Sequence, residues 1–494
     1  MEFLLPLDVH RYIFNYLDTI SQFRIRSVCK RFYNYLQIHH FNTYEHALLL
    51  QKFGNDEVLA KMTHLRSLYL DLRSLYLDNS YISTFSHLTN LKQLALFGNY
   101  HQKNIDRLYN LEELYLNNVL GIRDLNHLSK LTYLELVETK INDANIEKLT
   151  GIRSLQIIRY CEIKLFSRLT NLETLIISDD RTEFNNDQLS CLTNLKYLDA
   201  SMCPNISIVT DLTKLEFLDI RRIGNIRKII DLRNLYNLTK LVADRTDLNL
   251  EDISHLIQLE ELSVRSVSTL TAINCMKNLK FLDNCNGHLP NAEIANLTKL
   301  LSLDVRGNFM VTNLNNLYQL EKLVLGSQPC LTNHIISNLT KLTHLEMDHK
   351  NFIADLSSFT NLKVLIGGYC AGFKQTASLS KLTNLHTLDV RYWKISSLNH
   401  LKNLTKLDIS DCQIIEELNN LTKLRILKMN GTCHIPNLNH LVNLTYLEAR
   451  NICVTYESIK KLTNLEYLYS NIKFGNNGLS TLKRLRIFNS IRLS

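Results

Sequence analysis

The sequence lacks the features that mark a secreted or membrane protein. Its 11 cysteines stand one at a time between Cys29 and Cys453, with no Cys-x-x-Cys pair and no zinc-type spacing, so a disulfide framework is not expected. No apolar run approaches the roughly 20 residues that span a bilayer. Residues 1–10 have no basic start before a short apolar run, which argues against a signal peptide. We therefore expect the protein in a reducing compartment, the cytoplasm or the nucleus, without membrane contact.

Glycine and proline are scarce, at 14 and 5 of 494 residues, whereas Asn, Ile, Lys and Tyr are abundant. This composition is typical of an AT-rich genome, such as that of an amoeboid eukaryote or of a large DNA virus that infects one. In the viral case the protein would act in the host cytoplasm. The formal net charge of +8 is spread along the chain. Because no concentrated basic face is predicted, we expect no nucleic-acid partner.

Motifs for catalysis, metals and cofactors are also missing. The segment 367–374 has two glycines at the spacing of a phosphate-binding loop, but Phe373 stands where that loop needs Lys. The pair His39 and His40 has no carboxylate or thiol nearby that would complete a metal site. No nucleophile or metalloprotease signature occurs. We therefore predict no catalytic residue, no metal, no cofactor and no enzymatic activity of the chain's own.

What the sequence does contain is a repeat that begins near residue 62. The frame L-x-x-L-x-x-L-x-L, clear at Leu88, Leu91, Leu94 and Leu96, returns every 19 to 23 residues from there on. With one earlier unit at Met62, 26 residues before Leu88, it gives about 21 units in residues 62–494. This frame and period are those of a leucine-rich repeat. Its last two leucines alternate with polar residues, as in a strand with one buried face.

Stacked units of this kind are expected to share one leucine core and one long parallel sheet. About 20 residues per unit leave room on the return path for turns or a short 3₁₀ segment only. The predicted fold is therefore an α/β solenoid whose sheet lines the concave face, preceded by a small helical module.

Residues 1–45 form that module in the prediction. Pro6 suits a first helical turn, and Val9, Ile13 and Leu17 recur at helical spacing. So short a helical unit has only a small core of its own. The apolar side chains that this core cannot bury are therefore expected to bind a partner. Residues 46–61 are expected to be a helical linker or an N-terminal cap of the repeats.

Three blocks of this module resemble an F-box: Leu5-Pro6, then residues 13–17, then residues 28–33. F-boxes bind the adaptor Skp1 and through it a cullin, so the resemblance implies a place in a ubiquitin ligase. Many F-boxes have Leu where Gln22 stands here, and a neighbouring apolar residue is expected to substitute. The residues implied to form or support the Skp1 contact are Leu5, Pro6, Val9, Ile13, Leu17, Ile20, Phe23, Val28, Cys29 and Lys30.

The whole chain resembles the F-box/leucine-rich-repeat substrate receptors of eukaryotes, with two departures. Its repeats are shorter, and the position after the strand is not a regular Asn or Cys. That position is Asn308 and Cys412 in some repeats but Val119 and Trp393 in others. The backbone amides that a regular buried Asn would satisfy must therefore find other partners.

Strand residues that point away from the leucines are predicted to bind a protein substrate. Acid–Arg pairs two residues apart recur there, together with aromatic residues, and Arg and Tyr are frequent interface hot spots. Alternatively, these pairs neutralise each other across adjacent strands and keep a wide sheet soluble. The predicted substrate-binding residues are Asp219, Arg221, Arg265, Asp304, Arg306, Asp389, Arg391, Glu448, Arg450, Tyr467 and Tyr469.

Two functional hypotheses follow. In the first, the chain is the substrate-recognition subunit of a Skp1–cullin–F-box ubiquitin ligase, and the chemistry of ubiquitin transfer resides in other subunits. In the second, it is a non-catalytic interaction scaffold or decoy, including a viral one, that does not direct ubiquitination.

Overall fold

The computed structural model describes the repeat region in greater part than the N-terminal module. The described residues are 40–42, 62–71, 85–98, 100–159, 162–163, 166, 168–178, 186–201, 203, 206, 209–221, 231–246, 253–267, 272–326, 333–347, 355–367, 379–393, 395, 397–412, 418–431, 437–450, 454–471, 481–488 and 491–492. All the residues predicted to contact Skp1, and the linker 46–61, lie outside this set. The chain divides into two compact units, Met1–Leu238 and Thr239–Ser494.

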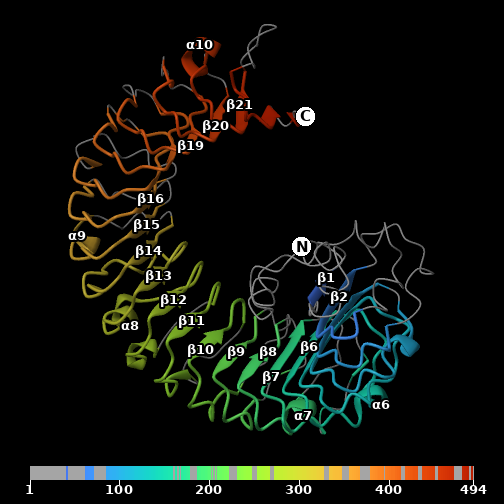
Figure 1. The fold of residues 1–494 in the computed structure, drawn as a ribbon. Helices are drawn as coiled ribbons and strands as arrows, with labels where there is room; N and C mark the ends of the chain where they lie inside the picture. The colour runs from blue at the N-terminus through green and yellow to red at the C-terminus, as the bar shows by residue number, and fades with distance from the viewer. Residues whose placement is uncertain are drawn as a thin grey trace, which may run out of the picture. The chain divides into compact units, whose positions relative to one another are not determined.

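In the first unit, the strands pair in sequence order, and each runs parallel to the next. The strands are β1 (His40–Asn42), β2 (Ser67–Asp71), β3 (Gln93–Phe97), β4 (Glu113–Asn117), β5 (Tyr133–Val137), β6 (Ser154–Ile158), β7 (Thr174–Ser178), β8 (Tyr197–Asp199) and β9 (Phe217–Asp219) (Figure 1). The short helices between them are η1 (Gln102–Asn104), α6 (Asp143–Ile146) and α7 (Asn186–Leu189).

The second unit continues the pattern with shorter strands, and each strand from β10 to β22 runs parallel to the next. The strands are β10 (Lys240–Val242), β11 (Glu261–Ser263), β12 (Phe281–Asp283), β13 (Ser302–Asp304), β14 (Lys322–Val324), β15 (His344–Glu346), β16 (Val364–Ile366), β17 (Thr387–Asp389), β18 (Lys406–Asp408), β19 (Ile426–Lys428), β20 (Tyr446–Ala449), β21 (Tyr467–Ser470), β22 (Ile487–Phe488) and β23 (Ile491–Arg492). The short helices are η3 (Ile273–Cys275), α8 (Asn291–Ile294), α9 (Asn333–Ile336) and α10 (Tyr456–Ile459).

Strand β4 shows why the leucine frame folds in this way. Leu114 and Leu116 are buried, and the residues that alternate with them are half-exposed. Leu108 and Leu111, earlier in the same repeat, are fully buried beside the turn that leads into the strand. Each buried leucine contributes roughly 1.5–3 kcal/mol, and no single repeat could bury all four alone. The predicted leucine-rich-repeat solenoid with a parallel sheet is therefore confirmed, and its described helices are only three or four residues long.

The ends of the sheet are covered by extra strands. Strand β1, at residues 40–42, lies within the segment 1–45 for which helices were expected, and it pairs in parallel with β2. At the other end, β23 turns back antiparallel to β22. Both strands satisfy backbone groups that an edge strand would otherwise expose, which is the physical reason for a strand at residues 40–42.

An asparagine ladder explains the recurring sequence Leu-Thr-Asn-Leu. The Nδ2 group of Asn110 donates to the Thr89 carbonyl of the previous repeat at 2.8 Å. Lys130 of the next repeat then donates to Asn110 Oδ1 at 2.6 Å. Asparagines that donate in the same way to the preceding repeat are Asn90, Asn171, Asn194, Asn237, Asn278, Asn361, Asn384, Asn403, Asn443 and Asn464. Each of these hydrogen bonds ties two consecutive turns together outside the sheet.

Candidate partner-binding face

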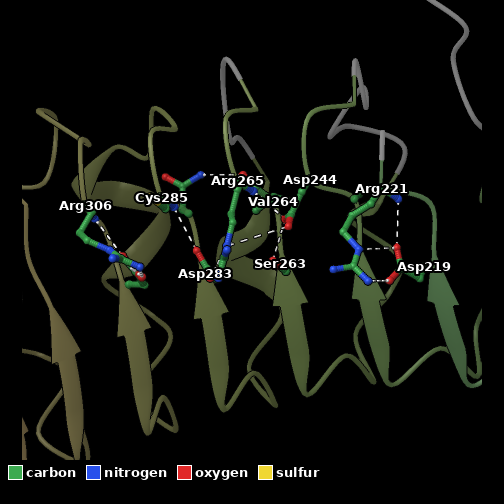
Figure 2. A network of polar contacts seen from close by, with 12 residues as sticks. Asp219, Arg221, Asp244, Ser263, Val264, Arg265, Asp283, Cys285 and Arg306 are labelled. Atoms are coloured by element: carbon green, nitrogen blue, oxygen red, sulfur yellow. Dashed lines mark hydrogen bonds and ion pairs between the residues drawn. The ribbon is translucent and has the colours of Figure 1, made fainter. Parts of the chain in front are cut away.

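The candidate site is the face of the sheet opposite the buried leucines, here called the polar face. It consists of the strand residues that alternate with the leucines and of the residue that follows them on the same side. In the second unit, Arg265 joins neighbouring repeats across this face (Figure 2). Its Nε donates to Asp283 at 2.7 Å, and its backbone N–H donates to Asp244 at 2.9 Å. Ser263 donates its hydroxyl to the same Asp244 carboxylate at 2.7 Å.

The other acid–Arg pairs form within a single repeat. Arg306 binds Asp304 with two nitrogens, Nη2 at 2.6 Å and Nε at 3.0 Å. Arg391 donates its Nε to Asp389 at 3.0 Å, whereas its distance to Asp408 of the next repeat is 4.0 Å. The sequence suggested that acid–Arg pairs neutralise each other across adjacent strands. In the structure, the acid and the arginine of most pairs come from the same repeat.

Polar-face aspartates also bind the backbone at the end of their own strand. The Asp304 carboxylate accepts the N–H of Arg306 at 3.1 Å, and the Asp199 carboxylate accepts the N–H of Ser201 at 2.9 Å. The same contact recurs at Asp219, Asp283, Asp389 and Asp408. These carboxylates thus accept hydrogen bonds from some of the backbone amides that a regular buried Asn after the strand would otherwise satisfy.

The two members of an acid–Arg pair differ in how far they are buried. The side chain of Asp219 is 2% exposed, whereas that of Arg221 is 48% exposed. Burial raises the pKa of Asp219, although its hydrogen bonds to Arg221 act in the opposite direction. A partner that approaches this face would therefore meet the arginines first, and the aspartates would position them.

Removing the guanidinium of Arg221 should destabilise the first unit in a pH-dependent way. Arg221→Ala leaves the buried Asp219 carboxylate without its cation, at an expected cost of about 1–3 kcal/mol at pH 7. The pKa of Asp219, already raised by burial, would rise further. A raised pKa in the folded state stabilises the fold at low pH and loses that contribution as pH rises through it, so the cost should shrink toward pH 4.

Urea unfolding at both pH values measures this change. Arg159→Ala is the matched control, because Arg159 pairs with an exposed Glu138 and is itself 69% exposed. Its effect should stay below about 0.5 kcal/mol. Equal destabilisation by Arg221→Ala at the two pH values would contradict the role given to Asp219.

An aromatic cluster lies at the C-terminal end of the second unit. Tyr446 faces Tyr467 and Tyr469 of the next strand, with ring centroids 6.1 and 5.7 Å apart. The Arg450 guanidinium stands 5.3 Å from the centre of the Tyr469 ring and 3.8 Å from Glu448. Four residues of the predicted substrate-binding set thus come together here, and Tyr446 lies beside them on the same face.

A second aromatic cluster lies in the first unit, and its Tyr133 was expected on this face whereas its Tyr115 was not. Tyr115 on β4 and Tyr133 on β5 have ring centroids 4.8 Å apart. Tyr115 donates its hydroxyl to Glu113 at 3.0 Å, and Tyr133 donates its own to Glu135 at 3.1 Å. Burial, followed by the hydrogen bond to Glu113, raises the pKa of Tyr115 to about 12. Both hydroxyls therefore remain protonated donors at neutral pH, and alignment of the polar positions of adjacent repeats could have revealed the group.

The predicted substrate-binding residues are spread over many strands and do not converge in one pocket. Among the residues that the structure describes, His, Cys, Asp and Glu form no group of three or more that could hold a metal ion. In the same part of the chain, none of the helices has the length and apolar character needed to cross a bilayer.

Comparison with known proteins bears first on the N-terminal segment. Residues 3–44 match the F-box domain family. The chain thus combines a segment that matches the F-box family with a leucine-rich-repeat fold. That match lies within the segment 1–45 and covers all three blocks that resembled an F-box.

Solved structures are similar to the repeat region. A crystal structure of TLR13 in complex with ssRNA13 matches with a TM-score of 0.58 and 19% identity, over 92% of this chain and 80% of that one. At 19% identity, this structural similarity shows the fold alone. The functional domain of InlJ from Listeria monocytogenes matches with a TM-score of 0.47 and 21% identity, over 71% of this chain and 75% of that one. A leucine-rich-repeat protein of Leptospira interrogans matches with a TM-score of 0.38 and 19% identity, over 88% of this chain and 98% of that one.

None of the curated proteins compared with the chain gave a significant match.

Proposed function

We propose that this chain is a substrate-recognition subunit of a Skp1–cullin–F-box ubiquitin ligase. The observation that supports the proposal is the combination of an F-box match at residues 3–44 with a leucine-rich-repeat fold over the rest of the chain. In this proposal the F-box binds Skp1, and through it a cullin, and the polar face binds the protein substrate.

The combination of an F-box with leucine-rich repeats is typical of adaptor proteins that are not enzymes. The polar-face aspartates fit an adaptor because their oxygens are engaged with backbone amides and arginines. We therefore propose that the chain has no active site and that other subunits of the ligase transfer ubiquitin. A cytoplasmic or nuclear location follows from the same proposal.

Charge reversal on the polar face tests the substrate-binding half of the proposal. The variant Arg221→Glu/Arg306→Glu/Arg391→Glu should lose most partner capture from cell extract and should bind Skp1 like the wild type. Arg425→Glu is the control, since Arg425 is exposed and lies off the polar face. Undiminished partner capture by the triple variant would contradict a substrate site on this face.

The scaffold or decoy function predicts a different result in the same system. A decoy would capture Skp1 or a partner, and no ubiquitin would reach that partner. Cullin-dependent ubiquitination of the captured partner therefore distinguishes the receptor from the decoy.

A further inference from the structure

The polar face of the first unit differs in charge from that of the second. Its strand residues from β2 to β9 include no Lys, Arg or His on this face. The same positions in the second unit include the lysines Lys240, Lys322, Lys406 and Lys428. The half-exposed acids on the polar face of the first unit are Glu113, Glu135 and Asp199, whereas Asp71 and Asp219 are buried and Asp219 is paired with Arg221. Aromatic side chains lie between them, with Tyr69 near Phe97, Tyr115 near Tyr133 and Tyr197 stacked on Phe217.

The centre of this acidic and aromatic surface is a square of four residues on two adjacent strands. Glu113 lies opposite Tyr133, and Tyr115 lies opposite Glu135. The two carboxylates thus occupy one diagonal and the two tyrosine rings the other. Each hydroxyl donates to the carboxylate of its own strand, at 3.0 and 3.1 Å, which fixes the carboxylates beside the rings.

The strands that flank the square place only neutral residues beside it. Gln93 and Ala95 lie next to β4, and Ser154 and Gln156 lie next to β5. A bulky or cationic neighbour is therefore missing at these positions of the described sheet, and the rings and carboxylates remain half-exposed.

Other acids in the same unit have a basic partner. Glu112 pairs with Lys92 at 2.5 Å, Glu138 with Arg159 at 2.7 Å, and Glu173 with Lys196 at 2.9 Å. Within the described part of the chain, Glu113 and Glu135 have no ion pair with Lys, Arg or His at 4.0 Å or closer. Two uncompensated carboxylates beside two tyrosine rings are suited to an external cation with a flat apolar face.

We propose that the polar face of the first unit binds an arginine-rich segment of the substrate protein, with Glu113, Tyr115, Tyr133 and Glu135 as its central contact. A guanidinium is planar, stacks on aromatic rings and donates to two carboxylates at once. A lysine ammonium is a point charge that cannot stack in this way, so arginine is preferred. This inference names the kind of substrate segment that the proposed function requires. It rests on that function in one respect, namely that the polar face binds the substrate.

Binding of a defined peptide to the full chain tests the proposal. The probe is a fluorescein-labelled peptide of alternating Arg and Ser, followed by fluorescence anisotropy. Glu113→Gln/Glu135→Gln keeps the shape of both side chains and removes both charges. It should weaken binding of the Arg peptide by about tenfold or more, because each lost contact is a charge-assisted hydrogen bond. The wild-type chain should bind a Lys peptide more weakly and a Glu peptide not at all.

Glu112→Gln is the matched control, because Glu112 is the neighbouring residue, lies off this face and pairs with Lys92. It should bind the Arg peptide within about twofold of the wild type. Circular-dichroism melting shows whether each variant is folded. If the double variant melts early, Glu135→Gln alone should still weaken binding by about threefold or more.

The proposal is overturned if the folded Glu113→Gln/Glu135→Gln variant binds the Arg peptide as the wild type does. It is also overturned if Glu112→Gln weakens binding as much as the double variant, or if the Glu peptide binds equally well. Because the assay contains neither Skp1 nor a cullin, its failure leaves the F-box proposal standing. Failure of Skp1 binding would likewise leave the peptide result unchanged.

Discussion

Changing Leu5 and Pro6 together to Ala should weaken the affinity of the chain for purified Skp1 by at least about 100-fold. Both residues lie near the start of the F-box match at residues 3–44. The resemblance to F-boxes places them in apolar contact with the adaptor. Truncation of two interface anchors loses about 2 kcal/mol or more at each hot spot. Isothermal titration calorimetry with the full chain measures the change.

Gln22→Ala is the control for this experiment. Gln22 lies in the same match, at a position where many F-boxes carry Leu, so its truncation should change the affinity by less than about threefold. Binding of the Arg peptide should be the same in the Leu5→Ala/Pro6→Ala variant as in the wild type. Wild-type affinity for Skp1 in that variant would mean that residues 1–45 do not act as an F-box.

Trp393→Ala should destabilise the second unit by about 3–5 kcal/mol, the largest stability effect that we expect from a single substitution. Trp393 is the one tryptophan of the chain and is only 2% exposed. Its Nε1 donates to the Gly367 carbonyl of the previous repeat at 3.2 Å. The ring fills the space above Gly367, where an added Cβ would lie 2.2 Å from the ring. The substitution therefore removes a large buried side chain and a hydrogen bond together.

Urea unfolding followed by circular dichroism measures this loss, since the variant has no tryptophan fluorescence. Phe309→Ala is the control, because Phe309 is an aromatic residue of the same unit that is 60% exposed. Its effect should remain within about 0.5 kcal/mol. An unfolding midpoint for Trp393→Ala equal to that of Phe309→Ala would contradict the packing described for this repeat.

The leucine frame predicted the sheet well because a buried strand leaves a period of two in the sequence. Leu114 and Leu116 are an example, since their spacing alone determines which side of β4 is buried. The asparagine ladder was not predicted, although Leu-Thr-Asn-Leu recurs throughout the sequence. A hydrogen bond such as that from Asn110 to the Thr89 carbonyl depends on how two turns stack, which periodicity does not specify.

The candidate site was predicted less completely than the fold. The sequence placed Asp219 and Arg221 on the same face, but it did not reveal that the carboxylate is buried and binds the backbone while the guanidinium remains exposed. Glu113 and Glu135 were missed because what distinguishes them is the lack of a basic neighbour on adjacent strands. That property becomes visible when the polar positions of adjacent repeats are aligned, as the register of β3 to β6 aligns them.

Reconstituted ubiquitin transfer tests the central claim most directly. The full chain, Skp1, a cullin module and a partner captured by the polar face are combined, and ubiquitin on that partner is measured. We predict transfer that is lost both with Leu5→Ala/Pro6→Ala and with Arg221→Glu/Arg306→Glu/Arg391→Glu. Transfer that survives either variant, or no transfer while Skp1 and partner are both bound, would contradict a substrate receptor.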